Sequence, residues 1–329
     1  MRLMEISRIK QALGGDVTLS VVTCLAPEAT NLMFDKLWRQ VYLFERQFSR
    51  FLPMSELSIF NRAAGLKTLI SPEFKKLLTS AKMLGIKTGG LYNPFILPAL
   101  QRAGYRQSAT PGYENDAQED HSLKQVVTVE HLAIGDNWAS IPYGTAIDMG
   151  GCGKGYLADQ LGQALRDQTG VEGYWLSLGG DISTWGYDEL GKNLMLSVQD
   201  AEDLAGNTDW VIHCSQKHTG IATSGTFRRH NQKAGKSWHH IIDPISLKPA
   251  ITDVRLATVC ADSALEADVL ASCAIILGSE KTPTFLKKHG ATAGLLQCTN
   301  NKGENFEIQF GSMIRKSLLP LTKVMLQNA

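Results

Sequence analysis

The chain has 329 residues, of which 43% are hydrophobic and 20% are charged, and its formal net charge is +1. Such a composition is typical of a soluble globular protein and gives no reason to expect nucleic acid or an anionic membrane as a partner. No apolar run reaches the ~18 residues of a membrane span, and the first ten residues contain no apolar signal core. We therefore expect a cytoplasmic protein without a membrane span, although a chain from which a leader had been removed would show the same N-terminal sequence pattern.

The first half of the chain predicts one strand followed by three helices. β-branched residues alternate in the strand, and apolar residues recur every three or four positions in the first helix, which Pro53 ends. Ser55 or a neighbour can cap the second helix, and Ser71-Pro72 opens the third with proline at its favoured first position. These elements cover, in order, 16–23, 27–51, 55–65 and 71–88.

The middle of the chain is rich in turn formers. The polar stretch 108–121 predicts a surface loop or a disordered insert. Two short apolar runs after it, 126–129 and 132–134, predict a hairpin.

The second half predicts a mainly antiparallel sheet with two helical regions. One helix begins near Lys154, and a capping box of Ser263 and Glu266 starts another over 264–277, which a lysine-rich helix follows. The predicted strands are 174–178, 194–198, 210–214, 221–225, 256–261, 294–297 and 306–310. With no internal repeat and no long linker, the pattern favours a single α+β domain over 1–329.

The stretch from Asp148 to Asp159, D-M-G-G-C-G-K-G-Y-L-A-D, places glycines directly before a predicted helix. Glycines let the backbone approach a ligand, and the helix N-terminus favours an anion. The spacing fits neither the P-loop nor the dinucleotide-binding fingerprint. The stretch therefore predicts a glycine-rich anion site of another type, with an ordinary tight turn as the alternative.

The six cysteines are scattered without a C-x-x-C pair, which is typical of reduced core thiols. Cys152 lies inside the glycine-rich stretch, where a low-pKa thiol is the alternative. A small apolar core residue is the commoner role for such a cysteine, and we expect that role here.

Two further positions carry groups suited to catalysis. Asp268 and Ser272 are four residues apart on one helix face, and their oxygens suit a hard cation such as Mg²⁺. The alternative is that Asp268 complements the helix dipole and Ser272 is a packing residue. His240 precedes a buried Ile-Ile pair and can move a proton at neutral pH, or it can be a structural hydrogen-bond donor.

A basic stretch of five side chains precedes His240. It is typical of a solvated surface loop, although such a loop could also close over phosphates. The side chains are Arg228, Arg229, His230, Lys233 and Lys236.

Short motifs follow one another in a fixed order along almost the whole chain. They are Leu13-Gly14-Gly15, Ser49-Arg50 with S-E-L-S at 55–58 and Asn61, 93–98, 148–159, 177–181, T-S-G at 223–225, H-I-I-D-P at the start of 240–249, and 267–272. Each motif is weak alone. As an ordered set they resemble the ApbE family, the FAD:protein FMN transferases.

The resemblance implies an ApbE-like (T-fold-like) α+β fold with a mainly antiparallel sheet and an FAD cleft between two subdomains. It also implies Mg²⁺ at the FAD pyrophosphate, and transfer of FMN to a Ser or Thr hydroxyl of a flavoprotein in an S/T-G-A-S/T-like stretch, with release of AMP. His240 and Asp268 are the implied catalytic residues, and the implied metal ligands are the Gly151 carbonyl, Asp268 and Ser272. The implied FAD contacts are Leu13, Phe51, Leu91, Tyr92, Asn93, Asp148, Lys154 and Ile242.

The chain departs from the family pattern at several positions. Asn93 replaces the usual aspartate, which predicts altered recognition of adenine or flavin. Ser272 replaces threonine and keeps the hydroxyl oxygen that a metal needs. The other departures are Leu13 for methionine, Gly15 for threonine, Gly153 for alanine, Thr226 for aspartate, and Ser246-Leu247-Lys248 for T-G.

In-line phosphoryl transfer requires neutralised charge on the diphosphate and a positioned oxygen nucleophile. Lys154 and Mg²⁺ can supply the charge, and His240, Asp181 or Asp243 can accept the proton of the hydroxyl. We therefore expect a Mg²⁺-dependent flavin transferase. The alternatives are an FAD pyrophosphatase that releases FMN and AMP, and a non-catalytic flavin-binding protein.

Overall fold

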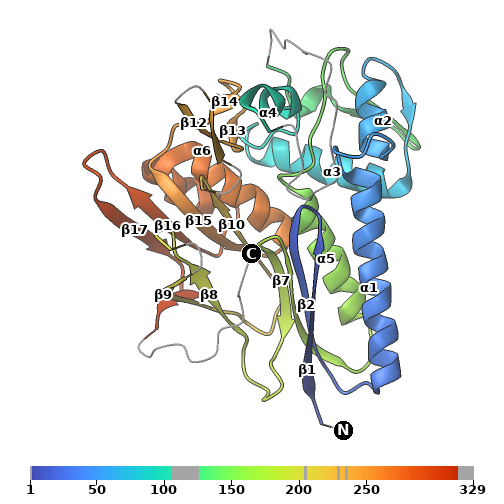
Figure 1. Cartoon of the computed structure of the whole chain (residues 1–329), viewed down its shortest axis with the longest axis vertical. Helices are drawn as coiled ribbons and strands as arrows, with labels where there is room; N and C mark the ends of the chain where they lie inside the picture. Colours follow the sequence, from blue (N-terminus) through green and yellow to red (C-terminus); the bar gives the residue numbers. More distant parts are fainter. Residues whose placement is uncertain (1, 106–125, 204–205, 228–229, 234–235, 318–329) are drawn as a thin grey trace.

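The computed structural model describes residues 2–105, 126–203, 206–227, 230–233 and 236–317, without the side chains of 230–238. The predicted surface loop 108–121 lies outside these residues. The central layer is an eight-stranded sheet in the order β1-β2-β6-β7-β10-β15-β16-β17, and every neighbouring pair is antiparallel (Figure 1). Its strands are β1 (Met4–Ala12), β2 (Gly15–Thr23), β6 (Val171–Leu178), β7 (Asp181–Gly186), β10 (Thr219–Gly225), β15 (Val254–Ala261), β16 (Ala293–Thr299) and β17 (Asn305–Phe310). The predicted antiparallel α+β class is confirmed.

Three long helices cover one face of this sheet: α1 (Pro27–Phe48), α5 (Gly153–Arg166) and α6 (Ala264–Lys288) (Figure 1). α1 and α5 pack on β2 and β6, whereas α6 packs on β10, β15 and β16. Non-helical backbone at Gly278, with φ 77°, interrupts α6 directly after the end predicted for its first part. The burial of apolar side chains from one face of each helix fixes these helices on the sheet.

A small second sheet covers part of the opposite face. It contains β8 (Met195–Gln199), β9 (Asn207–His213) and β18 (Ile314–Lys316), and Leu196 and Ile212 pack against the central strands. The prediction that 194–198 and 210–214 continue the main sheet is therefore wrong. Alternation of side chains reveals a strand, but it does not reveal which sheet the strand joins.

A second subdomain lies beside the sheet and contains α2 (Glu56–Arg62), α3 (Pro72–Lys87), α4 (Leu97–Ala103) and three short strands, β3 (Thr68–Leu69), β4 (Ala133–Ile134) and β5 (Trp138–Ser140). Phe60 and Phe74 pack edge to face in its core. The predicted hairpin of 126–129 with 132–134 is wrong, because Val129–His131 forms a 3-10 turn and β4 pairs with β5 instead.

Two small hairpins stand near α4: β11 (His230–Lys233) with β12 (Lys236–His239), and β13 (Ile242–Asp243) with β14 (Lys248–Pro249) (Figure 1). The basic stretch therefore belongs in part to a β-hairpin rather than to a simple loop, while Arg228 and Arg229 lie outside the described residues.

Serine caps begin the three helices as predicted, although the predicted capping box of α6 is seen only in its Ser263 half, because the Glu266 carboxylate pairs with Lys87. Ser55, Ser71 and Ser263 each accept a hydrogen bond from the backbone N–H three residues further on, at 3.0–3.1 Å. None of the helices in the described part of the chain combines the length and the apolar character of a membrane-spanning segment.

Candidate functional site

A cavity of about 440 Å³ lies where the second subdomain meets α5, α6 and the end of β10. All of the catalytic, metal-binding and FAD-contact residues that the family resemblance implies line it, although they come from distant parts of the chain, whereas the alternative proton acceptor Asp243 does not. They are Leu13, Phe51, Leu91, Tyr92, Asn93, Asp148, Gly151, Lys154, His240, Ile242, Asp268 and Ser272.

A buried ion pair forms one wall. The Nε of Arg50 lies 3.0 Å from Oδ1 of Asp148, and both side chains are at least 90% buried. The guanidinium lies over the rings of Phe51 and Tyr105, 4.2 and 4.6 Å from their centres. Arg50 thus orients both Asp148 and Phe51. Arg50 belongs to one of the motifs that resemble the ApbE family, but the sequence did not reveal this orienting role.

The glycine loop is held by an amide side chain from α2. Nδ2 of Asn61 donates to the Ile147 carbonyl and Oδ1 accepts from the Ile147 N–H, both at 2.9 Å. One residue later, Oδ2 of Asp148 accepts from the Gly150 N–H at 3.0 Å. These bonds fix the backbone on both sides of Asp148, so the loop is ordered by the protein itself. The sequence analysis assigned Asn61 no role, because its partner lies 86 residues away.

Helix α5 begins at this loop. Its N-cap residue is Cys152, whose side chain makes no capping hydrogen bond to the described part of the chain. Lys154, in the first turn, forms an ion pair with Asp181 at the start of β7. The carboxylate of Asp181 is almost fully buried. The start of α5 therefore favours an anion in the cavity, and because an ammonium has three hydrogens to donate, Lys154 can contact that anion while it stays paired with Asp181.

Cys152 is a buried thiol rather than an exposed nucleophile. Burial is the main cause that raises the pKa of its thiol to about 12, and the charges of Asp268 and Asp148 raise it further. The thiol is fully buried beside Tyr92. The low-pKa alternative is therefore wrong, and Cys152 is a core residue.

Two oxygen groups from α6 face the cavity opposite the loop. Asp268 is only 4% exposed, and the Ser272 hydroxyl lies 3.1 Å from the Ser224 hydroxyl at the end of β10. Within the described residues no group of three or more His, Cys, Asp or Glu side chains is suited to a metal ion. One carboxylate, one hydroxyl and the Gly151 carbonyl fit a hard cation that keeps several waters, which is the coordination that Mg²⁺ prefers.

The sequence profile of the ApbE family matches residues 13–296. The chain belongs to the ApbE family. It is 26% identical over 291 residues to the FAD:protein FMN transferase of Klebsiella pneumoniae (strain 342), covering 86% of this chain and 81% of that protein. It is also 26% identical over 296 residues to the FAD:protein FMN transferase of Salmonella typhimurium, covering 88% of this chain and 82% of that protein.

Solved ApbE structures share the fold. The apo form of the flavinyl transferase ApbE from Pseudomonas stutzeri superposes with a TM-score of 0.78 at 19% identity, covering 94% of this chain and 95% of that chain. The ApbE protein of Thermotoga maritima gives a TM-score of 0.78 at 21% identity, covering 92% and 96%. The predicted ApbE-like architecture is thereby confirmed.

The hydrogen bonds of Asn93 explain why an asparagine, rather than the usual aspartate of the ApbE pattern, stands at this position. Its Nδ2 donates to the Val127 carbonyl at 2.7 Å, while Oδ1 accepts from the Phe95 N–H at 3.0 Å. An aspartate at this position would place an oxygen against the carbonyl and could not donate to it. The amide therefore holds the segment at Val127 against the cavity wall, a role that the sequence analysis did not foresee.

At the other side of the ApbE cavity, the His240 and Tyr105 rings pack in a T-shaped arrangement, with ring centres 6.2 Å apart. Its neighbour His239 turns away, and its Nε2 lies 3.0 Å from the Ala250 carbonyl oxygen. Burial lowers the pKa of His239, so the neutral ring is favoured at neutral pH. Of this pair, only His240 lines the cavity.

Leu13 lines the ApbE cavity from the two-residue turn between β1 and β2. Its φ of 56° is unusual for a residue with a side chain. The carboxylate of Glu45 on α1 accepts a hydrogen bond from the Leu13 N–H at 2.9 Å and stabilises the turn. Burial raises the pKa of Glu45 and this hydrogen bond opposes the shift.

Proposed function

We propose that this chain transfers FMN from FAD to a Ser or Thr hydroxyl of a flavoprotein and releases AMP. The oxygen of the acceptor hydroxyl attacks the phosphorus of the FMN moiety, the bond to the bridging oxygen of the diphosphate breaks, and the hydroxyl proton passes to a base. Relatives named FAD:protein FMN transferase, of which the chain covers more than four fifths, support this proposal.

One observation carries the proposal: the start of α5 and the oxygen groups of α6 line the same cavity. Lys154 brings a positive charge from one side, and Asp268 and Ser272 bring oxygen ligands from the other. A diphosphate between them would meet a cation and a metal site at once, which is what an in-line displacement at phosphorus requires.

Mg²⁺ would be held by the Gly151 carbonyl, Asp268 and Ser272, and when bound it supplies charge neutralisation at the diphosphate. Lys154 binds the phosphate oxygens directly. The Ser224 hydroxyl, 3.1 Å from that of Ser272, would help to hold the Ser272 oxygen at the metal position.

His240 is the group we assign to proton acceptance. Of the other two candidates, Asp243 does not line the cavity and accepts the backbone N–H groups of Ile245 and Ser246 at 2.9 and 3.3 Å, while Asp181 lies on the Lys154 side of the cavity, where the diphosphate is proposed to bind. His240 lines the cavity at the edge where α4 and the β13–β14 hairpin meet. An acceptor segment of the S/T-G-A-S/T type would enter on this side.

The apolar part of the cavity suits the ring systems of FAD. Phe51 and Leu91 are half-buried and present surface that a flat aromatic ring can cover, while Tyr92 and Ile242 are buried beneath. Asp148 and Asn93 supply polar groups at the same wall. These residues bind and orient FAD, and Arg50 keeps Phe51 and Asp148 in place.

Mass spectrometry of the protein with FAD, Mg²⁺ and a peptide carrying an S/T-G-A-S/T stretch tests the proposal. We expect the peptide to gain one FMN residue only when Mg²⁺ is present. Asp268→Ala should abolish the gain, whereas Glu280→Ala, an exposed carboxylate in the same helical element, should not. Free FMN and AMP without a modified acceptor would indicate the pyrophosphatase instead. Unchanged FAD with several acceptors would indicate a flavin-binding protein.

A further inference from the structure

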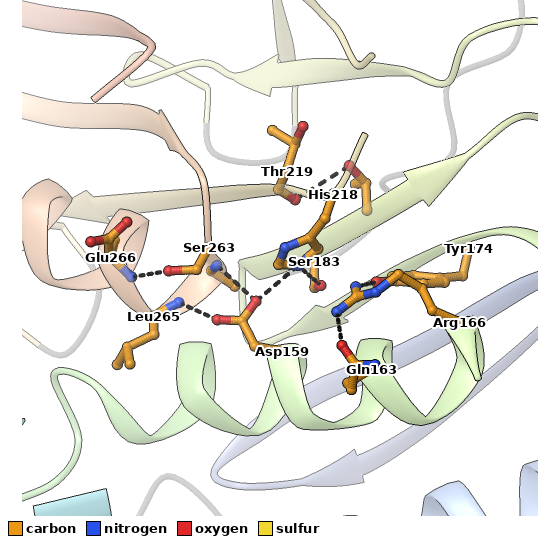
Figure 2. A network of polar contacts seen from close by, with 12 residues as sticks. Asp159, Gln163, Arg166, Tyr174, Ser183, His218, Thr219, Ser263, Leu265 and Glu266 are labelled. Atoms are coloured by element: carbon orange, nitrogen blue, oxygen red, sulfur yellow. Dashed lines mark hydrogen bonds and ion pairs between the residues drawn. The ribbon is translucent and has the colours of Figure 1, made fainter. Parts of the chain in front are cut away.

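Asp159 closes the glycine-rich motif of α5 and lies outside the cavity lining. Figure 2 shows its carboxylate directed at the start of α6. Oδ1 accepts a hydrogen bond from the Ala264 N–H and Oδ2 from the Leu265 N–H, both at 2.9 Å. The two residues are the first of α6, and their N–H groups have no partner within the helix. A carboxylate from a different helix thus caps α6.

The backbones of α5, α6 and β10 meet at the same point. A Cβ at Gly155 would lie 2.5 Å from the Ala264 carbonyl oxygen, and a Cβ at Gly220 would overlap the backbone of Ser263. Gly155 is four residues before Asp159, so both lie on one face of α5. The start of α6 is therefore packed closely between α5 and β10, and Asp159 fixes it by hydrogen bonds.

A histidine side chain from outside the two helices also stabilises this arrangement. Nε2 of His218 lies 3.1 Å from Oδ1 of Asp159 and 3.0 Å from the Ser183 hydroxyl on β7 (Figure 2). Ser183 is fully buried. The imidazole holds the carboxylate in the orientation in which each oxygen meets one N–H of α6.

The capped end of α6 is also the end that carries the proposed metal ligands. Asp268 and Ser272 follow Ala264 by about one and two turns of helix. Lys154 and the Gly151 carbonyl lie at the start of α5, on the other side of the contact. A small rotation of the α6 start would move the α6 ligands relative to the glycine loop.

We propose that Asp159 is a positioning residue that sets the α6 metal ligands in register with the glycine loop, and that His218 holds Asp159 in place. The proposal rests on the proposed function, because it assumes that Asp268 and Ser272 bind a metal. Removal of one hydrogen-bonding oxygen at Asp159 would then weaken metal binding without any direct contact to the metal. Groups that orient metal ligands typically change metal affinity by about 10–100-fold.

Asp159→Asn is the main test, because asparagine keeps the shape but offers one acceptor oxygen. Binding of Mn²⁺ to the full chain, followed by electron paramagnetic resonance, measures metal affinity without turnover. We expect Mn²⁺ affinity to fall by about tenfold, FAD affinity without metal to change less than twofold, and saturating Mg²⁺ to restore kcat. Hydrogen exchange should also become faster at Ala264 and Leu265. Asp167→Asn, an exposed carboxylate at the other end of α5, is the matched control and should change none of these readouts.

Unchanged Mn²⁺ affinity in Asp159→Asn would overturn the proposal, as would equal losses of Mn²⁺ and FAD affinity, which indicate general loosening. If that variant does not fold, His218→Gln is tested in its place. We expect it to lower Mn²⁺ affinity by about tenfold, the low end of the range for groups that orient metal ligands. Unchanged Mn²⁺ affinity in that variant would overturn the proposal. A wild-type protein that binds Mn²⁺ but transfers no FMN would refute only the proposed function. A wild-type protein that binds no Mn²⁺ would refute both.

Discussion

Helices α5 and α6 begin in opposite ways, although their first turns face the same region. At α6, the N–H groups of the first three residues are accepted by Asp159 and by the Ser263 hydroxyl. At α5, the N-cap residue is Cys152, and its thiol caps no N–H group within the described parts of the chain. Only the α5 start opens into the cavity with glycines and a lysine around it.

This contrast indicates what each helix start does. A helix start whose N–H groups are already bonded gains nothing from an anion, whereas one without side-chain caps still favours negative charge. Ser263 and Asp159 therefore make α6 a fixed support for the proposed metal ligands. The glycines and Lys154 leave α5 able to receive the phosphates of a ligand.

The largest expected effect comes from the contact between the two helices. Gly155→Ala would place a methyl group 2.5 Å from the Ala264 carbonyl oxygen, and neither backbone can move without disturbing the cap. We expect the free energy of unfolding to fall by about 3 kcal/mol, measured by urea denaturation. Gly151→Ala is the control, because its Cβ would meet only Tyr92 at an ordinary 3.7 Å. Equal stability of the two variants would show that the helices do not meet this closely.

The next effect concerns the open helix start. Lys154→Ala should reduce FAD affinity by about thirtyfold, the equivalent of one hydrogen bond to a charged group. Riboflavin affinity should change less than twofold, because riboflavin has no phosphate. Fluorescence titration with both ligands measures the difference. Equal losses for FAD and riboflavin would mean that the α5 start does not contact phosphate.

The two caps of α6 also show which structural features the sequence could predict and which it could not. The Ser263 cap was predicted, because cap and N–H are three residues apart in the chain. The Asp159 cap could not be predicted, because its partner is 105 residues away. Local patterns report local hydrogen bonds, and a cap supplied by another helix leaves no local pattern.

The strands follow a similar rule. β2 was predicted from its buried β-branched residues, but its partner β1 was missed because it is an edge strand with exposed Ser, Arg, Lys and Gln side chains. The site residues were predicted through the ordered family motifs, and spacing alone favoured structural roles for Asp268 and His240. Arg50 and Asn61 were visible in those motifs, yet their roles required knowledge of Asp148 and Ile147 as neighbours.

A smaller effect distinguishes the two caps of α6. Ser263→Ala should cost about 1 kcal/mol of stability, because one N–H loses its acceptor while Asp159 still holds two. Thermal unfolding measures the loss. Mn²⁺ affinity should remain within twofold of wild type, since the Asp159 contact persists. A tenfold loss of Mn²⁺ affinity would instead make Ser263 the residue that sets the register of α6.

The smallest expected effect is at the cap position of α5. Because burial raises the pKa of Cys152 to about 12, only roughly one molecule in ten thousand carries the thiolate at pH 8. Iodoacetamide at that pH should therefore modify the half-buried Cys24 before Cys152, as peptide mapping by mass spectrometry can show. Unfolding in guanidinium should remove the difference, because the thiol then regains its ordinary pKa. Rapid labelling of Cys152 in the folded protein would mean that the thiol reaches the cavity, and the α5 start would then carry a nucleophile as well as a positive charge.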